Sequence, residues 1–94
     1  MEFIVYIIYS TKLDKYYIGR TSNLTERIQL HNMGVFKNSY TSKVNDWALV
    51  FSLNCDSLEQ VLSIEKHIKR MKSRNYIENL VKYPEISKRL LDRY

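Results

Sequence analysis

Phe3-Ile-Val-Tyr-Ile-Ile-Tyr9 is the stretch that decides the fold. Its residues are β-branched or aromatic without polar alternation, which is typical of a strand covered on both faces. A polar, turn-like segment follows over residues 10–15, and Tyr16-Tyr-Ile-Gly19 predicts a second strand. The two strands should form a hairpin. Gly19 at the end of the second strand allows a bend or a close approach of another backbone.

The segment after this hairpin predicts a helix that starts near Thr21. Asn23 suits the N-cap, and Glu26 stands three residues on, as in a capping box. Gly34 is the expected left-handed C-cap. Residues 35–46 form a polar loop in this interpretation, and Trp47-Ala-Leu-Val-Phe-Ser-Leu53 predicts the third strand.

Three helical segments complete the chain. Asp56 or Ser57 caps the first, which should run to about residue 72, and Ser73 caps the next over residues 74–82. Pro84 suits the first position of a last helix that ends near residue 93. The predicted order is ββαβααα in one α+β domain over residues 1–94, with a three-stranded, mainly antiparallel sheet flanked by helices. The last helix either covers the core or pairs two chains.

Composition narrows the function classes. The 94 residues include 15 Lys and Arg against 10 Asp and Glu, for a net charge of +5, and a single Cys. One cysteine excludes a disulfide framework and a cysteine-based zinc site, and the longest apolar run is too short to span a bilayer. We therefore expect a cytoplasmic protein without a membrane partner. The positive charge favours a polyanion such as nucleic acid, although a merely soluble basic protein fits the same numbers.

One carboxylate falls on an apolar helix face. At 100° per residue, Glu65 lies inside an arc of apolar side chains formed by Leu58, Val61, Leu62, Ile64, Ile68 and Met71. An inward carboxylate is costly unless it is paired, hydrogen-bonded or bound to a metal. Glu65 is therefore either half of a structural ion pair or a metal ligand or acid–base group at the edge of the sheet.

The first helix shows a similar anomaly. Arg27 and His31 share the face of Leu24 and Ile28 that should meet the sheet. Two potential cations on a partly buried face are unfavourable, and an anion, either Glu65 or a phosphate, would relieve this.

These residues together resemble the GIY-YIG nuclease family, most closely its small stand-alone bacterial members and the N-terminal nuclease domain of the excinuclease C subunit. Val5-Tyr6-Ile7 takes the place of the first signature triplet and Tyr17-Ile18-Gly19 that of the second. Arg27 lies on the first helix at the usual position, Glu65 follows on a later helix, and Asn75 comes shortly after it. Val5 replaces the first glycine, Arg20 stands where excinuclease-like members often carry Lys, and His31 where they carry Tyr.

The resemblance implies hydrolysis of DNA phosphodiesters with one divalent ion, Mg²⁺ or Mn²⁺, and little sequence specificity. Glu65 would bind the metal, because Mg²⁺ prefers oxygen ligands and keeps several waters. Arg27 would hold phosphate oxygens in a fork and stabilise charge in the transition state. Tyr17 or His31 would accept the proton of the attacking water, and the residues leave this choice open. Tyr6 would orient the water or the base.

The expected substrate is DNA, which is branched or damaged in one version of the hypothesis. Asn75 should steady the phosphate or a neighbouring side chain. The candidates for contacts to the DNA backbone are basic: Arg20, Lys37, Lys43, Lys69, Arg70, Lys72 and Arg74. Two alternatives remain open, namely a nucleic-acid-binding module with little activity alone and a module that depends on a protein partner for specificity. Repair, defence and mobile-element transfer all fit as pathways.

Overall fold

The computed structural model describes residues 2–36 and 39–94 and confirms the predicted α+β class and the order ββαβααα. A short 3-10 turn over Tyr40–Lys43 lies inside the predicted loop. The strands and helices are β1 (Phe3–Ser10), β2 (Lys15–Thr21), α1 (Leu24–Asn32), β3 (Ala48–Cys55), α2 (Leu58–Met71), α3 (Arg74–Lys82) and α4 (Pro84–Arg93).

β1 is the central strand of the sheet, whose order is β2-β1-β3 with both pairings antiparallel. The five residues from Ile4 to Ile8 are buried, as an apolar run without alternation predicts for a strand covered on both faces. The pairing with β3 shifts register between Ile7 and Ile8. β2 therefore lies at an edge of the sheet, and no strand pairs with its outer side among the described residues.

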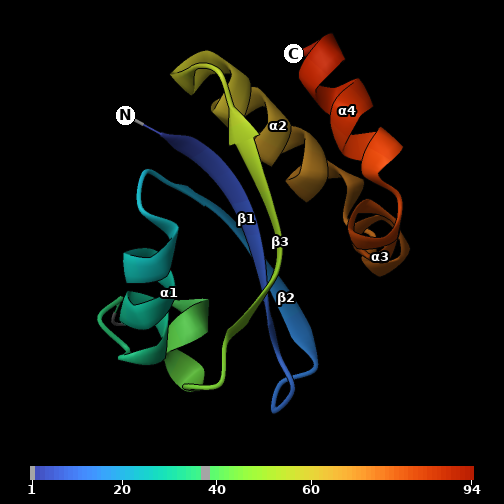
Figure 1. Cartoon of the computed structure of the whole chain (residues 1–94). Helices are drawn as coiled ribbons and strands as arrows, with labels where there is room; N and C mark the ends of the chain where they lie inside the picture. The colour runs from blue at the N-terminus through green and yellow to red at the C-terminus, as the bar shows by residue number, and fades with distance from the viewer. Residues whose placement is uncertain (1, 37–38) are drawn as a thin grey trace.

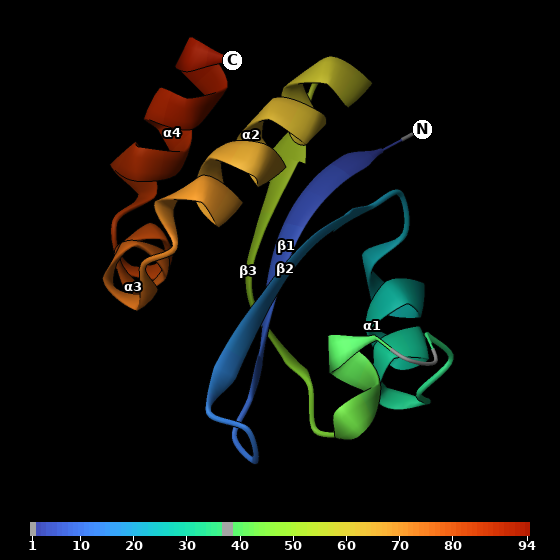
Figure 2. The same ribbon diagram turned by 180° about the vertical axis from the view of Figure 1, so that it is seen from behind.

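Helices cover the two faces of the sheet unequally (Figures 1 and 2). Val5 and Ile7 point to the face covered by α2, α3 and α4, where they share a core with Ile64 and Leu80. Tyr6 and Ile8 point the other way and pack with Trp47 and residues of α1. Successive β1 side chains thus belong to two separate cores.

Local capping explains where the helices begin. The side chains of Asn23, Ser57 and Ser73 accept hydrogen bonds from backbone N–H groups in the first turns of α1, α2 and α3. Gly34 follows α1 with a φ of 70°, in the left-handed region that favours glycine. These boundaries follow the sequence because each cap is a contact between near neighbours in the chain.

The predicted faces of α2 are only partly correct. Leu58, Leu62 and Met71 are exposed although they belong to the predicted apolar arc, and Gln60, a polar residue outside that arc, is buried. The amide of Gln60 donates to the carbonyl of Leu91 in α4. The packing of α4 beside α2 therefore changes which residues of α2 are covered.

α4 covers the core. Leu90 is buried, and Ile86 and Leu91 pack against the same cluster as the α2 and α3 residues.

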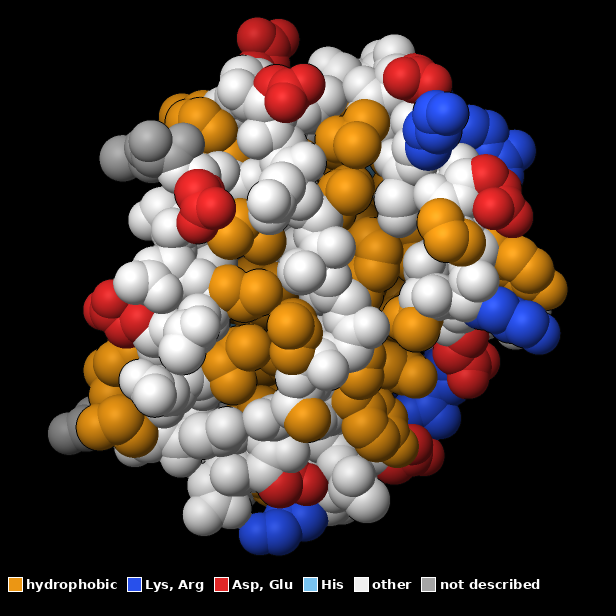
Figure 3. Space-filling model, viewed as in Figure 1, with side chains coloured by type: hydrophobic (Ala, Val, Ile, Leu, Met, Phe, Trp, Pro, Cys, Tyr) orange, Lys and Arg blue, Asp and Glu red, His pale blue; other side chains and the backbone are white. Residues whose placement is uncertain are grey.

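On the face where β3 lies in front, the cationic side chains gather toward the rim (Figure 3). Within residues 2–36 and 39–94, no helix is long and apolar enough to cross a membrane.

Candidate active site

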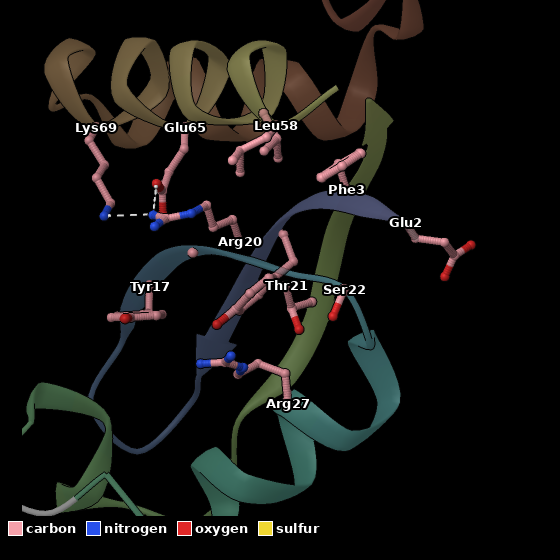
Figure 4. Close-up of a pocket in the computed structure, with 13 residues that line it drawn as sticks. Glu2, Phe3, Tyr17, Arg20, Thr21, Ser22, Arg27, Leu58, Glu65 and Lys69 are labelled. Atoms are coloured by element: carbon pink, nitrogen blue, oxygen red, sulfur yellow. Dashed lines mark hydrogen bonds and ion pairs between the residues drawn. The ribbon is translucent and has the colours of Figure 1, made fainter. Parts of the chain in front are cut away.

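A pocket of about 430 Å³ opens at the free edge of β2, between α1 and α2 (Figure 4). Four of the five predicted catalytic residues line it: Tyr6, Tyr17, Arg27 and Glu65. Arg20 and Lys69 line it as well. Residues from both faces of the sheet therefore meet around the edge strand.

Strand register places the two tyrosines. Tyr17 pairs with Ile8 and Gly19 pairs with Tyr6, so both tyrosine side chains lie on the face that α1 covers. A Cβ at Gly19 would lie only 2.5 Å from the Tyr6 hydroxyl oxygen. Glycine at this position is required because the Tyr6 side chain crosses directly over the backbone of its partner strand.

Glu65 sits at the opposite side of the pocket and is held by two cations. Its Oε1 lies 2.9 Å from Arg20 Nη1, and its Oε2 lies 3.3 Å from Lys69 Nζ. The Glu65 side chain is only 9% exposed, whereas Arg20 and Lys69 are about half exposed. The structure is compatible with both hypotheses for Glu65, because the carboxylate forms ion pairs and also faces the pocket, where it could bind a metal.

Arg27 points into the pocket from α1 (Figure 4). Its guanidinium lies 5.2 Å from the centre of the Phe36 ring, which orients it by a cation–π contact. Among the residues that the structure describes, no carboxylate lies within ion-pair distance of Arg27. The anion expected beside Arg27 is thus not Glu65, and its donors remain available to an incoming oxyanion.

His31 lies behind the pocket. It is buried, and its two ring nitrogens are both engaged, with Nε2 2.8 Å from the Tyr6 hydroxyl and Nδ1 2.8 Å from Thr41 Oγ1. Burial first, and the charge of Arg27 second, lower the pKa of His31 below its usual value. A neutral imidazole that donates from one nitrogen and accepts at the other satisfies both contacts.

Tyr6 is kept protonated by its surroundings. Burial chiefly, followed by neighbouring Tyr17, raises the pKa of Tyr6 well above its usual value. The Tyr6 hydroxyl is therefore a hydrogen-bond donor at neutral pH and a poor proton acceptor.

The family model described as the GIY-YIG catalytic domain matches residues 2–78. The chain belongs to the GIY-YIG family. Its fold is the nuclease-type fold of that domain, and the match contains the whole pocket. α4 lies beyond the matched region.

Two similar proteins carry the same name. The chain is 35% identical over 69 residues to a UPF0213 protein of Syntrophus aciditrophicus, a match that covers 73% of this chain and 79% of that protein. It also resembles the solution NMR structure of a UPF0213 protein from Bacillus halodurans, with a TM-score of 0.55 and 29% identity over 87% of this chain and 84% of the other. Each relative is thus little longer than the matched region, which agrees with the predicted small GIY-YIG branch.

The other described residues that were predicted to bind DNA do not line this pocket. Lys72 and Arg74 line a neighbouring groove, and Lys43 lines a third hollow beside Asn45. Arg70 and Asn75, both exposed, line none of these three. Lys37 lies outside the described residues.

Sequence reasoning missed two features of the site. The Arg20–Glu65 pair joins β2 to α2 across 45 positions, so no local pattern could connect them. Thr41 contacts His31 from the 3-10 turn, and its position in a polar loop gave no signal of burial. Gly19 was recognised as a site of close approach, but what approaches it is a side chain, Tyr6.

Proposed function

We propose that this protein is an endonuclease that hydrolyses DNA phosphodiester bonds with a divalent metal ion. The observation that carries the proposal is the meeting of Tyr6, Tyr17, Arg27 and Glu65 in one pocket of a GIY-YIG domain. The pocket combines the groups that this reaction needs: a guanidinium group that can bind phosphate oxygens, a carboxylate and phenol hydroxyls.

Phosphate binding falls to the two arginines. Arg27 offers donors that no described carboxylate occupies, and Arg20 can turn from Glu65 to an oxyanion because its side chain is 48% exposed. Planar guanidinium groups bind phosphate oxygens through two parallel hydrogen bonds and stabilise charge that grows during phosphoryl transfer. A phosphodiester in the pocket would thus complete the charge balance of this site.

The residues present fit a hard divalent cation. Glu65 supplies one carboxylate that faces the pocket, and Mg²⁺ commonly binds through one or two carboxylates together with substrate phosphate and water. No group of three potential metal ligands occurs among the described residues, so substrate oxygens would supply the rest. GIY-YIG nucleases are generally metal-dependent. When bound, the ion would polarise the scissile phosphate and stabilise the leaving oxygen.

The proton chemistry assigns different roles to the three ring side chains. His31 acts only through Tyr6, because the described contacts bury it behind that residue. With His31 Nε2–H donating to its oxygen, the protonated Tyr6 hydroxyl would donate a hydrogen bond to the water or to a phosphate oxygen. Tyr17 lines the pocket, so we propose the deprotonated oxygen of Tyr17, rather than His31, as the group that accepts the proton of the attacking water.

One observation favours a second candidate, a nucleic-acid-binding module with little activity alone. Both oxygens of Glu65 are engaged by Arg20 and Lys69. If this arrangement persisted with DNA bound, the two cations would compete with a metal for the carboxylate. A protein partner that displaces the two cations would then increase cleavage.

A cleavage assay with matched variants tests the proposal. Plasmid and branched DNA are incubated with the wild type, Glu65→Gln and Glu59→Gln, in Mg²⁺, Mn²⁺ or EDTA. Glu59 is the control because it is an exposed carboxylate on the same helix. We expect cleavage that needs metal, a loss of at least about a hundredfold in Glu65→Gln and little change in Glu59→Gln. Metal-independent cutting, or equal rates in the two variants, would contradict the assignment.

The proposal also covers the extent of the functional domain, its location in the cell and its preference among DNA substrates. We propose one functional domain over residues 1–94, active in the cytoplasm, whose phosphate contacts position DNA without reading its bases. A preference for branched or damaged DNA, as in repair, would then come from DNA shape or from a partner protein. Comparing plasmid with branched substrates in the same assay measures that preference.

A further inference from the structure

A second groove, of about 460 Å³, lies between the β1–β2 hairpin and the junction of α2 and α3. Basic side chains dominate its polar lining. They are Lys15, Lys69, Lys72 and Arg74, against one acidic residue, Asp14. The hydrophobic floor includes Ile18, Ile68 and Ile77.

We propose that this groove is a second phosphate subsite, which holds the DNA backbone a few nucleotides away from the bond that is cut. This inference rests on the proposed nuclease function and adds to it the path of the substrate. Lys69 would mark the passage between the two sites, and Lys72 would be the main phosphate contact in the groove.

Lys69 joins the two sites because it lines both the pocket and the groove. Glu65 and Lys69 are four residues apart and share one face of α2, and Lys72 follows directly after the last residue of that helix. Seven residues of helix span about 10 Å. That length corresponds to roughly three base-pair steps of a duplex whose axis runs along α2, at a rise of about 3.4 Å per step. A strand that leaves the pocket along α2 therefore meets the groove.

The acidic residue of the groove is already neutralised. Arg74 Nη2 lies 2.9 Å from Asp14 Oδ1 and 2.6 Å from the Asp14 carbonyl oxygen. The hydrogen bond from Arg74, and a second from the Tyr9 hydroxyl, lower the pKa of Asp14. Arg74 also lies over the Tyr16 ring, 5.4 Å from its centre. The charge left for a ligand is therefore that of the lysines.

Lys72 occupies an unusual backbone position. It ends α2 with a φ of 47° and a ψ of 40°, in the left-handed conformation that glycine or asparagine normally takes at a helix end. The charge of lysine suits the C-terminal end of a helix, but the left-handed conformation disfavours residues with a Cβ. A lysine side chain held on the groove at the expense of backbone strain points to a role in binding.

The strained position makes a selective test possible. Lys72→Gly removes the charge and relieves the backbone, so the fold should be kept or stabilised while DNA binding weakens. Lys66→Ala is the control, since Lys66 is an exposed lysine of the same helix that lines neither site. Both changes are introduced into the chain with Glu65→Gln, and duplex DNA is titrated in EDTA between about 50 and 200 mM salt.

We expect the salt slope of binding to fall by about one unit in Lys72→Gly, as for one lost phosphate contact, and to stay unchanged in Lys66→Ala. Thermal melting should show that Lys72→Gly is at least as stable as its parent. Equal slopes in the two variants would overturn the groove proposal even if the wild type cuts DNA. A slope difference without any cleavage by the wild type would support the groove and reject the nuclease.

Discussion

At the scale of single residues, the site depends on how the Tyr6 side chain is held. His31 bonds its hydroxyl from behind, and Gly19 leaves room for it across the strand pair. Thr41 in turn bonds the other nitrogen of His31. These contacts fix the direction of one hydroxyl group, so small changes among them should affect chemistry more than folding.

Gly19→Ala should therefore lower cleavage strongly while the protein stays folded. The new Cβ would lie 2.5 Å from the Tyr6 hydroxyl oxygen, which must move. We expect a loss of about a hundredfold, because misplacing a positioned group by about 1 Å can cost that much. The measurement is the cleavage rate at saturating metal, with circular dichroism as a check of folding.

Gly34→Ala is the matched control for this change. Gly34 has a φ of 70° and nothing within 4 Å of an added Cβ, so alanine there strains the backbone without touching the site. We expect a loss of stability of about 1 kcal/mol and a cleavage rate near that of the wild type. If Gly34→Ala reduces cleavage as much as Gly19→Ala does, the loss reflects folding and not the position of Tyr6.

His31 also predicts how stability depends on pH. Its pKa is lowered in the folded state, so the unfolded chain binds more protons near pH 6.5, and stability falls as the pH drops through that value. His67, whose pKa is lowered chiefly by burial, acts in the same direction. Urea unfolding of the wild type should give a lower free energy at pH 5 than at pH 7.5.

His31→Asn should flatten this pH dependence more than His67→Asn does, because His31 is the more deeply buried of the two. The quantity compared is the difference in unfolding free energy between the two pH values, not the stability at either one. Stability that is independent of pH in the wild type would contradict the lowered pKa values.

At the scale of the elements, β2 and α2 bring the charged residues together. The sequence predicted both elements, because hydrophobic pattern and capping act between residues close in the chain. It did not predict that Arg20 pairs with Glu65, or that Gln60 is buried under α4. Those contacts join elements far apart in sequence, and only the packing of the elements determines them. The same limit explains why His31 could be placed on the inner face of α1 but not behind Tyr6.

The pairing across these two elements predicts weak binding of metal to the free protein. Arg20 and Lys69 compete with a divalent ion for the carboxylate of Glu65. Lys69→Met should raise Mn²⁺ affinity in the absence of DNA by up to about fivefold, since an ion pair with a half-exposed partner contributes at most about 1 kcal/mol. Electron paramagnetic resonance of free Mn²⁺ measures this affinity.

Lys66→Met provides the comparison, because it removes the same charge from an exposed position of α2 outside the pocket. Its Mn²⁺ affinity should rise less than that of Lys69→Met. Equal affinities in the two variants would show that overall charge, rather than the pairing of Lys69 with Glu65, governs access of the metal.

At the scale of the whole molecule, the site depends on a helix outside the family match. α4 follows the matched residues 2–78, yet Leu90 is buried among side chains of the α2 and α3 core. Gln60 ties α4 to α2 by a hydrogen bond to the Leu91 carbonyl. Since α2 carries Glu65 and Lys69, the position of these groups relies on packing at the far end of the chain.

Leu90→Ala should destabilise the whole protein, by about 2–5 kcal/mol, because it leaves a cavity in the core. The melting temperature should fall by about 10 °C or more for a chain of this size. Arg89→Ala, at the exposed neighbouring position, should change stability by less than about 0.5 kcal/mol. DNA binding by Leu90→Ala should be lost in parallel with its unfolding as temperature rises, since one cooperative unit carries both core and site. If Leu90→Ala had the same melting temperature as the wild type, α4 would contribute little to the core. The claim that the position of Glu65 depends on α4 would then be wrong.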